Sequence, residues 1–407
     1  MCAGMAEDGI ADSGRAWRRL AAATALGTVG GVGMWSVVVV LPAVQAEFGV
    51  DRAAAALPYT LTMVGFAVGG LLMGRLADRI GIVPPLLLGT VCLALGYGLS
   101  ALATNLWQFA LVHGVLVGAL GSSVAFGPLM ADVSRWFSRR RGLAVALCAS
   151  GNYLAGTLWP PVVERAVHAY GWRATQAGIG LFCLVAMLPL ALAMRGRPPR
   201  ASATRAAGPQ AVTTLSPAAL QGLLVVAGTA CCVAMAMPQV HIVAYCSDLG
   251  YGVARGAQML SLMLGFGIVS RVASGFVADR IGGLATLLAG ALLQAAALAL
   301  YLAFDDLTSL YVISALFGLF QGGIVPAYAI IVREYLPAEE AGARIGAVLM
   351  ATLAGMALGG WLTGAIFDAT GSYRAAFVNG LAWNAVNVAI VLWLIHCRRA
   401  RTSPAAL

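Results

Sequence analysis

Long apolar stretches alternate with short polar ones along the whole of this chain. Twelve apolar stretches can be distinguished, at residues 20–42, 57–77, 84–104, 107–133, 142–165, 174–195, 218–246, 257–277, 284–304, 309–333, 344–366 and 375–396. Each has about 20 residues or more, and a helix of that length crosses the ~30 Å hydrocarbon core of a bilayer. The pattern therefore predicts an all-α membrane protein with twelve transmembrane helices. The lipid bilayer is its expected partner.

The composition agrees with this prediction and excludes other classes. Of the 407 residues, 60% are hydrophobic and only 10% are charged, whereas the surface of a soluble domain needs far more charge. The net charge of +9 would suggest a nucleic-acid partner in a soluble protein. Here it reflects arginine-rich loops, so no nucleic-acid partner is expected. The chain contains no lysine, which excludes a Walker A nucleotide site.

Catalytic and metal chemistry have no visible basis in the sequence. The eight cysteines form no CxxC pair and lie mostly inside apolar stretches, whereas metal and redox sites need clustered ligands. No carboxylate pair and no nucleophile with a neighbouring base falls in the middle of an apolar stretch. We therefore expect no enzymatic activity, no metal and no cofactor.

The arginines are distributed unevenly between the two sides of the expected membrane. With a cytoplasmic N-terminus, nineteen of the 25 arginines lie on the cytoplasmic side, five lie on the other side, and Arg271 lies within a span. Because cytoplasmic loops carry the excess of basic residues, both termini are expected in the cytoplasm. The expected location is the plasma membrane, and the inner membrane if the source is a bacterium.

A long polar stretch, RGRPPRASATRAAGPQ at residues 195–210, divides the spans into six and six. It is rich in Pro, Ala and Arg and has no apolar periodicity, as is typical of a linker. The expected organisation is a disordered cytoplasmic N-terminus (1–19), a six-helix bundle (20–195), a cytoplasmic linker (196–217), a second six-helix bundle (218–396) and a cytoplasmic tail (397–407).

The two halves contain an internal repeat. GRLADRIG (74–81) follows the second span and GFVADRIG (275–282) follows the eighth, with six of eight positions identical at an offset of 201 residues. Internal repeats of six helices are typical of secondary transporters, which bind substrate between the halves near the membrane midplane.

Each copy of the repeat has parts that suit a gate. Its first glycine would allow a close helix approach or a tight turn, and its aspartate would lie at the start of the next helix or pair with an arginine. A generic charged turn is the alternative. The expected gate consists of Gly74, Asp78, Arg79, Gly275, Asp279 and Arg280, with Asp132 and Arg135 at the inner end of the fourth span.

The GxLADRxG element resembles the loop 2–3 signature of the major facilitator superfamily. The resemblance extends over the whole chain, through the number of helices, the central linker and the signature in both halves. It implies the major facilitator fold, two pseudo-symmetric six-helix bundles, with a single chain as the functional unit.

Arg271 is the chemically most informative residue, because a charge deep in a membrane-spanning helix is costly and marks a substrate path. Its counterpart at the offset of 201 is Gly70, so only one half has the cation. No Asp or Glu falls at mid-depth in any span. A mobile carboxylate anion is therefore the expected partner of the guanidinium. An arginine held by backbone carbonyls or extended to the cytoplasmic interface is the alternative.

A narrower resemblance is to the monocarboxylate porter and oxalate/formate antiporter branch of this superfamily. The arginine of SRVASG looks like that branch's substrate arginine. Similar stretches are MPQVHIVAYCSDLGYG (237–252), RWFSRRRGLAVALCASGNYLAG (135–156) and GGIVPAYAIIVREYLP (322–337). Two departures stand out. Gly267 occupies the place of an aspartate that serves proton coupling in the animal carriers, and the lysine of the oxalate/formate exchanger has no equivalent. A single cation favours a monovalent substrate, and the coupling mechanism stays open.

Five further polar residues at depth are candidates for the cavity lining. They are His241 and Tyr328, each close after a proline, and Asn152, Gln321 and His113. His241 could bond the substrate or carry a proton, and Asn152 could orient a carboxylate. Hydrogen bonding or packing between helices is the alternative for all five.

The leading hypothesis is a transporter of small monocarboxylates such as lactate, pyruvate or formate, working by alternating access, with proton coupling left open. A proton-driven drug or metabolite efflux antiporter is the alternative within the same superfamily, as is a dicarboxylate/formate exchanger. A sensor or accessory subunit with a transporter fold is a further class, but no signalling domain is attached.

Overall fold

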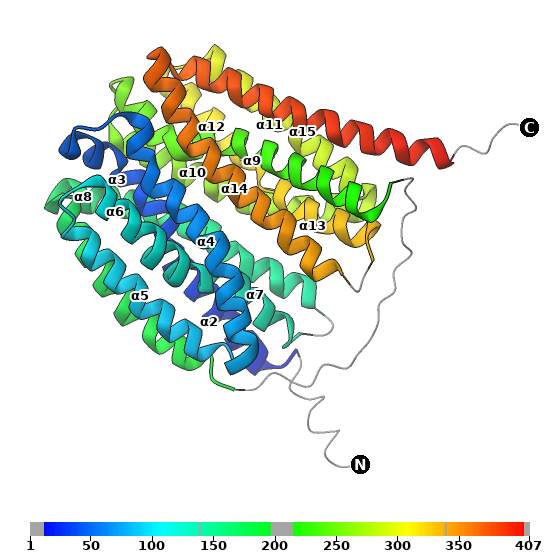
Figure 1. The fold of residues 1–407 in the computed structure, drawn as a ribbon, viewed down its shortest axis with the longest axis horizontal. Coiled ribbons are helices and arrows are strands. Elements are labelled where there is room, and N and C mark those ends of the chain that lie inside the picture. The colour runs from blue at the N-terminus through cyan, green and yellow to red at the C-terminus, as the bar shows by residue number, and fades with distance from the viewer. Residues whose placement is uncertain (1–11, 138–139, 197–214, 338–339, 403–407) are drawn as a thin grey trace, which may run out of the picture. The chain divides into compact units, whose positions relative to one another are not determined.

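The computed structural model describes residues 12–137, 140–196, 215–337 and 340–402, and within them it contains helices and turns but no strand. The first half forms α2 (Gly14–Gly30), α3 (Val32–Phe48), α4 (Arg52–Ile80), α5 (Val83–Ala101), α6 (Leu106–Val112), the π-helical η1 (His113–Gly121), the 3₁₀ η2 (Ser122–Ala125), α7 (Gly127–Ser134) and α8 (Arg141–Ala193). The second half forms α9 (Pro217–Asp248), α10 (Val253–Ile281), α11 (Gly283–Ala303), α12 (Leu307–Gln321), α13 (Ile324–Tyr335), α14 (Ala341–Thr370) and α15 (Tyr373–Thr402) (Figure 1).

Among the described residues, eleven helical segments are long and apolar enough to cross a membrane. The longest, α8, is broken at Gly171, whose φ of 79° and ψ of 160° are not helical. This break divides α8 into two spans, so each of the twelve predicted spans has a counterpart. The predicted all-α membrane fold is confirmed.

Three spans are built from more than one helix. α2 and α3 meet at Gly31, α12 and α13 meet at a short turn before Ile324, and the fourth span runs through α6, η1, η2 and α7. At Gly31 a Cβ would lie 2.6 Å from the Cβ of Ala155 on α8. Glycine is required there because two helices approach closely. The hydrophobic pattern does not reveal these breaks, since apolar residues continue through them.

The chain forms two compact units, one of residues 1–204 with 253–261 and the other of residues 205–252 with 262–407. We call them the N-unit and the C-unit. Helix is present in both predicted terminal segments, because α2 begins at Gly14 and α15 continues to Thr402. The expectation of disorder up to residue 19 is therefore wrong for residues 14–19. Residues 1–11, 403–407 and most of the predicted linker (197–214) lie outside the described residues.

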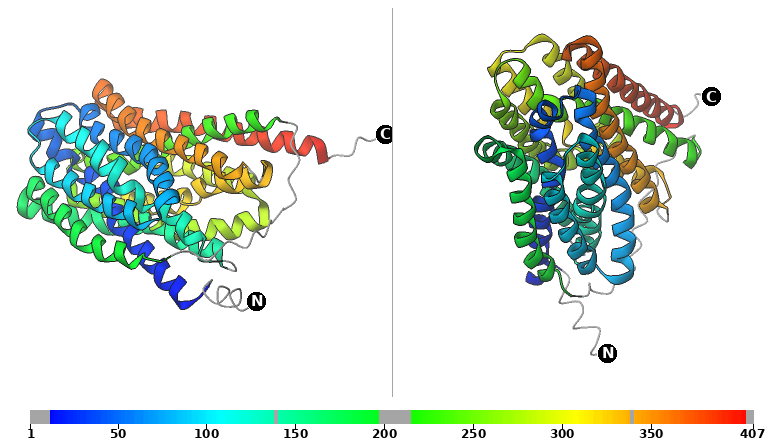
Figure 2. Two further views of the ribbon diagram at one scale, coloured as in Figure 1. Left: turned by 60° about the horizontal axis from the view of Figure 1, so that its bottom comes forward. Right: turned by 60° about the vertical axis from the view of Figure 1, so that its left-hand side comes forward.

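Within the N-unit, α2 and α5 pack along α8, and α4 packs along η1 (Figure 2). The last contact is very close, because a Cβ at Gly69 of α4 would overlap the carbonyl oxygen of Ala119. Within the C-unit, α9 packs along α14 and α15, and a Cβ at Gly318 of α12 would overlap the carbonyl oxygen of Met263. Glycines thus set the helix spacing in both units.

Helix ends outside the apolar core are capped by side chains. Asp51 accepts a hydrogen bond from the backbone N–H of Ala54 at the start of α4, and Asp306 accepts one from Ser309 at the start of α12. The hydrogen bonds from Ser309 hold the pKa of the Asp306 carboxyl below its usual value. Capping of this kind satisfies N–H groups that have no partner within the helix.

The glycines in the two copies of the repeat have a different backbone conformation from the one expected. Gly74 and Gly275 lie inside α4 and α10, and a Cβ at either would meet no atom within 4 Å. The expected close approach or tight turn at these glycines is therefore wrong. The last glycines of the copies, Gly81 (φ 86°) and Gly282 (φ 82°), have the left-handed φ and end the two helices. Only glycine adopts such a φ without strain.

Candidate functional site

Arg271 lies in the buried stripe of α10. Positions that recur every three or four residues on this helix are buried or half-buried, and they include Gly267, Arg271, Ser274 and Ala278. The opposite face has exposed apolar side chains such as Phe276, which is 67% exposed. Since residues spaced in this way share one face of a helix, Arg271 belongs to the packed face of α10.

The residues next to Arg271 on α10 and at the facing α12–α13 junction have small side chains. A Cβ at Gly322, at the α12–α13 junction, would lie 2.8 Å from the Cβ of Ser270, and one at Gly323 would overlap Ser274. The side chain of Ser274 donates to the carbonyl oxygen of Arg271 at 3.1 Å. Small residues therefore bring the α12–α13 junction close to α10 on either side of Arg271 in sequence.

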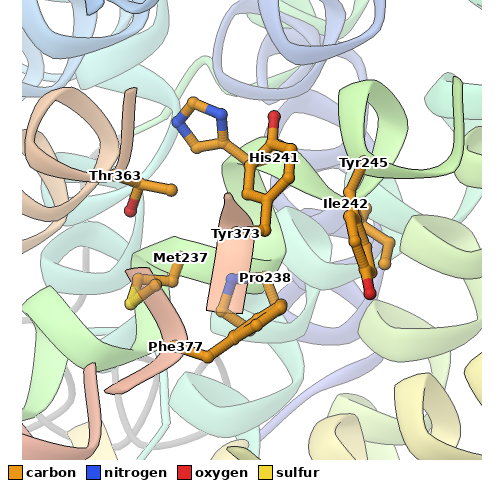
Figure 3. Close-up of a pocket in the computed structure, with 8 residues that line it drawn as sticks. All are labelled: Met237, Pro238, His241, Ile242, Tyr245, Thr363, Tyr373 and Phe377. Atoms are coloured by element: carbon orange, nitrogen blue, oxygen red, sulfur yellow. The ribbon is translucent and has the colours of Figure 1, made fainter. Parts of the chain in front are cut away.

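His241 lines a recess within the C-unit. The recess has about 210 Å³ of space including its open mouth, and it is lined by Met237, Pro238, His241, Ile242, Tyr245, Thr363, Tyr373 and Phe377 (Figure 3). These residues come from α9, α14 and α15. The ring of Tyr373 lies between those of His241 and Tyr245, at centroid distances of 5.9 and 5.1 Å. The His241 Nε2 donates to the carbonyl oxygen of Gly360 at 2.8 Å, so this bond ties α9 to α14.

Gln321 and Tyr328 bond to other helices of the C-unit. The Gln239 amide on α9 donates to the Gln321 Oε1 at 2.9 Å, and the Tyr328 hydroxyl donates to the Asn387 Oδ1 on α15 at 2.9 Å. Gln321, Tyr328 and Asn387 are fully buried, and Gln239 nearly so. Both bonds fit the alternative interpretation of polar residues between transmembrane helices, which hold a bundle together.

Asn152 and His113 belong to the N-unit. The backbone carbonyl of Asn152 accepts a hydrogen bond from the Trp35 indole at 3.2 Å, and its side chain is half-buried beside the α2–α3 junction. His113 is fully buried at the start of η1, with its ring 4.4 Å from that of Phe109 and 5.9 Å from that of Tyr97. Of the six predicted substrate-binding residues, therefore, two lie in the N-unit and four in the C-unit.

The predicted gate residues of the N-unit include one ion pair. The Arg135 guanidinium lies 3.3 Å from the Asp78 carboxylate, and both side chains are largely exposed. In the C-unit, Asp279 and Arg280 are exposed, and within the described residues Asp279 has no ion pair. There the Glu334 carboxylate accepts from the backbone N–H of Gly283 at 3.0 Å, at the start of α11. The two units thus secure the corresponding helix ends by different contacts.

Asp132 pairs with a residue that the sequence did not single out. Arg19 of α2 donates to both carboxylate oxygens of Asp132, at 2.7 and 3.0 Å, and to the carbonyl oxygen of Met194 at 2.7 Å. Its guanidinium also lies 4.5 Å from the ring centre of Trp136. The side chains of the pair are 4% and 5% exposed. Asp132 is thus bound by Arg19, although Arg135 is its near neighbour in sequence.

A second arginine clamp secures the other end of the N-unit. Arg173, just after the break in α8, donates to the Glu47 carboxylate at 2.5 Å and to the carbonyl oxygens of Ala101 and Ala103 at 2.9 and 2.7 Å. The Trp172 indole donates to the same carboxylate. Sequence reasoning missed both clamps, and the signal that could have indicated them was weak: an arginine and an acid near span ends.

Comparison with known proteins identifies the family of this chain. Residues 23–305 and 274–406 match the model of the Major Facilitator Superfamily. Monocarboxylate transporter 13 of Bos taurus is 31% identical over 355 residues, covering 84% of this chain and 82% of that protein. The Rattus norvegicus protein of the same name is 30% identical, covering 83% and 79%. The MFS-type transporter pynF of Aspergillus niger is 26% identical, covering 74% and 69%.

Solved structures agree on the fold. A bacterial homolog of the human lysosomal transporter Spinster, in an inward-facing and occupied conformation, superposes with a TM-score of 0.66 at 15% identity. The alignment covers 94% of this chain and 96% of that one. The unoccupied inward-facing structure of the homolog gives a TM-score of 0.68.

Proposed function

Since the chain belongs to the major facilitator superfamily, we propose that it carries a small monocarboxylate across a membrane by alternating access. Substrates of the size of lactate, pyruvate or formate fit the proposal. The relatives named monocarboxylate transporter 13, at 30–31% identity, support it. The functional unit in this proposal is one chain, in the plasma membrane, with both termini in the cytoplasm.

The observation that carries the proposal is the position of Arg271. Its charge is permanent, it lies inside a membrane-spanning helix, and it belongs to the packed face of α10 rather than to the exposed face. An arginine at such a position marks a substrate path. Its planar guanidinium donates two parallel hydrogen bonds to one carboxylate, which favours this group over a neutral or cationic one.

The number of cations supports a monovalent substrate. Arg271 is the one arginine that the sequence places in the middle of a span, and the chain has no lysine. A dicarboxylate in the same place would retain one uncompensated charge in a medium of low dielectric constant, which is costly. His241, Gln321 and Tyr328 hold helices of the C-unit in position, because each already bonds another helix.

Uptake of radiolabelled lactate, pyruvate and formate into proteoliposomes tests the proposal. Replacing Arg271 by Ala should reduce uptake at least ~10-fold, since a hydrogen bond to a charged group contributes about 1.5–3 kcal/mol. Arg271→Lys keeps the charge but loses the forked geometry, and it should give an intermediate rate. Unchanged uptake by Arg271→Ala would show that this residue does not bind the substrate.

The matched control is Arg255→Ala. Arg255 lies on the same helix and is exposed at its start, where it donates to Gln258 at 3.4 Å. Uptake by this variant should equal that of the unmodified protein. A substrate panel separates the competing functions. Transport of dicarboxylates alone would contradict the single-cation argument. Transport of larger apolar molecules alone would favour efflux, the function named for a Paecilomyces divaricatus relative that is 25% identical.

A further inference from the structure

The two halves of the chain differ in the charge of corresponding loops. In the N-unit, residues 74–83 and 131–142 contain six arginines and two acidic residues. In the C-unit, the corresponding residues 275–284 and 332–344 contain three arginines and four acidic residues. The proposed orientation places all four loops on the cytoplasmic side, so the general preference for arginine on that side does not explain the difference. The excess of positive charge is a property of the N-unit.

Three exposed arginines come together at this end of the N-unit. Arg15 and Arg18 lie one turn apart at the start of α2, and Arg195 follows the end of α8. The carbonyl oxygen of Arg195 accepts a hydrogen bond from Arg19 at 3.4 Å. A Cβ at the next residue, Gly196, would lie 2.8 Å from the Nη2 of Arg15. We call Arg15, Arg18 and Arg195 the arginine cluster.

The acidic residues at this end already have other partners. Asp132 is bound by Arg19, and Asp78 pairs with Arg135. Asp12 accepts a hydrogen bond from a backbone N–H at 3.4 Å. The arginine cluster forms no ion pair with any residue that the structure describes. Three positive charges therefore lie together without a counter-ion in the described part of the chain.

The start of α2 is an electrostatically unfavourable place for arginine. The N-terminal end of a helix carries a partial positive charge, which favours acidic residues and disfavours cations. α2 has Arg15 in its first turn and Arg18 just after it, and its first turn contains no acidic residue. An anion bound at this end would interact favourably with the guanidinium groups and with the end of the helix.

The cluster lies at the depth of lipid head groups. Arg18 and Arg15 precede the apolar stretch that begins at Leu20 by two and five residues, which is ~3 and ~7.5 Å along the helix. The head-group layer extends about 5–7.5 Å beyond the hydrocarbon on each side. Trp17 lies between the two arginines and packs edge-on against Phe137 at 5.2 Å. Tryptophan is enriched in this layer of the membrane.

An apolar stripe on α8 leads to the cluster. Leu181, Val185 and Leu188 recur every three or four residues and are 64%, 65% and 41% exposed. Leu192, one turn later, is half-buried, and the exposed Arg195 follows three residues after it. Residues with this spacing share one face of a helix. A lipid beside α8 could therefore place its acyl chains on the stripe and its head group at the arginine.

From these observations we propose that the arginine cluster binds the head group of an anionic phospholipid whose acyl chains lie along the apolar stripe of α8. The negative charge of the head group supplies the counter-ion that the cluster lacks. In the proposed orientation this lipid belongs to the cytoplasmic leaflet, where anionic lipids attract arginines next to a span. The inference does not depend on the identity of the transported substrate.

Lipid binding to the purified full-length protein in a neutral detergent tests the proposal. Native mass spectrometry counts the lipids retained at increasing concentrations of phosphatidylglycerol or of zwitterionic phosphatidylcholine. Phosphatidylglycerol should bind at least ~10-fold more tightly, since each arginine near an anionic lipid contributes about fivefold. Arg15→Gln combined with Arg195→Gln should weaken phosphatidylglycerol binding about 25-fold. Equal binding of the two lipids to the unmodified protein would contradict the proposal.

The matched control is Arg165→Gln combined with Arg333→Gln. It removes the same charge from two exposed arginines outside the cluster, and it should weaken phosphatidylglycerol binding by less than about twofold because distant exposed charges are screened. Equal losses in the two double variants would show attraction to net charge and no site. Arg195→Gln alone serves if the double variant unfolds, because the Arg195 side chain makes no hydrogen bond or ion pair within the described residues. It should weaken binding about fivefold, and unchanged binding would refute the site.

Glycerol phosphate separates a lipid from a soluble phosphate compound. It has the phosphate of the head group but no acyl chains, so it should bind at least ~10-fold more weakly than phosphatidylglycerol, because it buries no apolar surface on α8. Glycerol phosphate that binds as tightly as the lipid would overturn the assignment to a phospholipid. A hexaglutamate peptide that does so would instead indicate an acidic protein segment as the partner, and it would overturn the assignment as well.

Discussion

Three arginines of this chain, Arg19, Arg173 and Arg271, have two different kinds of surroundings. Arg19 and Arg173 each bind a carboxylate and backbone carbonyls at an end of the N-unit. Arg271 instead lies inside α10, at the packed face. The clamps hold helix ends, where carbonyls without a helical partner are available to a donor. Arg271 lies away from the ends of α10, and a charge at such a place in a membrane-spanning helix is the basis of the proposed carboxylate site.

Asp132→Asn should destabilise the protein by about 3–5 kcal/mol, because it leaves the buried Arg19 charge without a counter-ion. The midpoint of thermal unfolding in detergent measures this. Asp78→Asn is the control, because Asp78 pairs with Arg135 at the surface, and an exposed ion pair contributes at most about 1 kcal/mol. Equal losses in the two variants would contradict the distinction between buried and exposed pairs.

At the level of helices, glycine decides how closely neighbours pack. Gly69 and Gly70 are adjacent on α4 but have opposite surroundings. A Cβ at Gly69 would overlap the carbonyl oxygen of Ala119, and one at Gly70 would meet no atom within 4 Å. Gly70 is also the counterpart of Arg271 at the repeat offset of 201 residues. The repeat thus has an open position on α4 where α10 has its cation.

Gly69→Ala should destabilise the N-unit by about 1–3 kcal/mol, since the added methyl forces α4 away from η1. Gly70→Ala should be neutral or stabilise α4 by up to about 1 kcal/mol, because alanine has the higher helix propensity. Thermal unfolding of the two variants side by side gives the comparison. If both changed stability alike, the close contact between α4 and η1 would be in doubt.

At the level of the whole molecule, the two units are stabilised by different chemistry. Charged clamps hold both ends of the N-unit. In the C-unit, bonds of uncharged side chains such as Gln239 to Gln321 and Tyr328 to Asn387 link buried parts of the helices, and the charged contacts of Glu334 and Arg344 lie near helix ends. Uncharged hydrogen bonds can lie at membrane depth without the desolvation cost of a charge. These two bonds therefore link helices of the unit with the expected substrate cation without adding a fixed charge.

The arginine distribution predicts which loops face the cytoplasm. In a background with Cys2 and Cys397 replaced by Ser, a cysteine at Thr104 should react with a membrane-impermeant maleimide on intact cells. A cysteine at Arg280 should react only after permeabilisation. Both positions are exposed, so access depends on the side of the membrane alone. The reverse labelling would show that the termini lie outside the cytoplasm.

The sequence was sufficient for much of the fold and for less of the candidate site. It placed all twelve spans and found both copies of the repeat. It misjudged the first glycines of these copies, which are helical and unconfined, and missed the last ones, which end the helices. A glycine in a sequence motif can lie inside a helix or can end it with a left-handed φ. The motif alone could not distinguish these two roles, because the φ depends on whether the helix continues.

The sequence by itself determined the lengths of the apolar spans and the positions of the arginines. A helix that crosses a bilayer needs about 20 consecutive apolar residues, and it needs no contact with distant parts of the chain. The same holds for the cation in α10. Only the tertiary structure decided the partners of the polar residues, since Arg19 and Asp132 are 113 residues apart and Gln239 and Gln321 are 82 apart. A buried polar group bonds whatever the neighbouring helix presents, and only packing determines which helix that is.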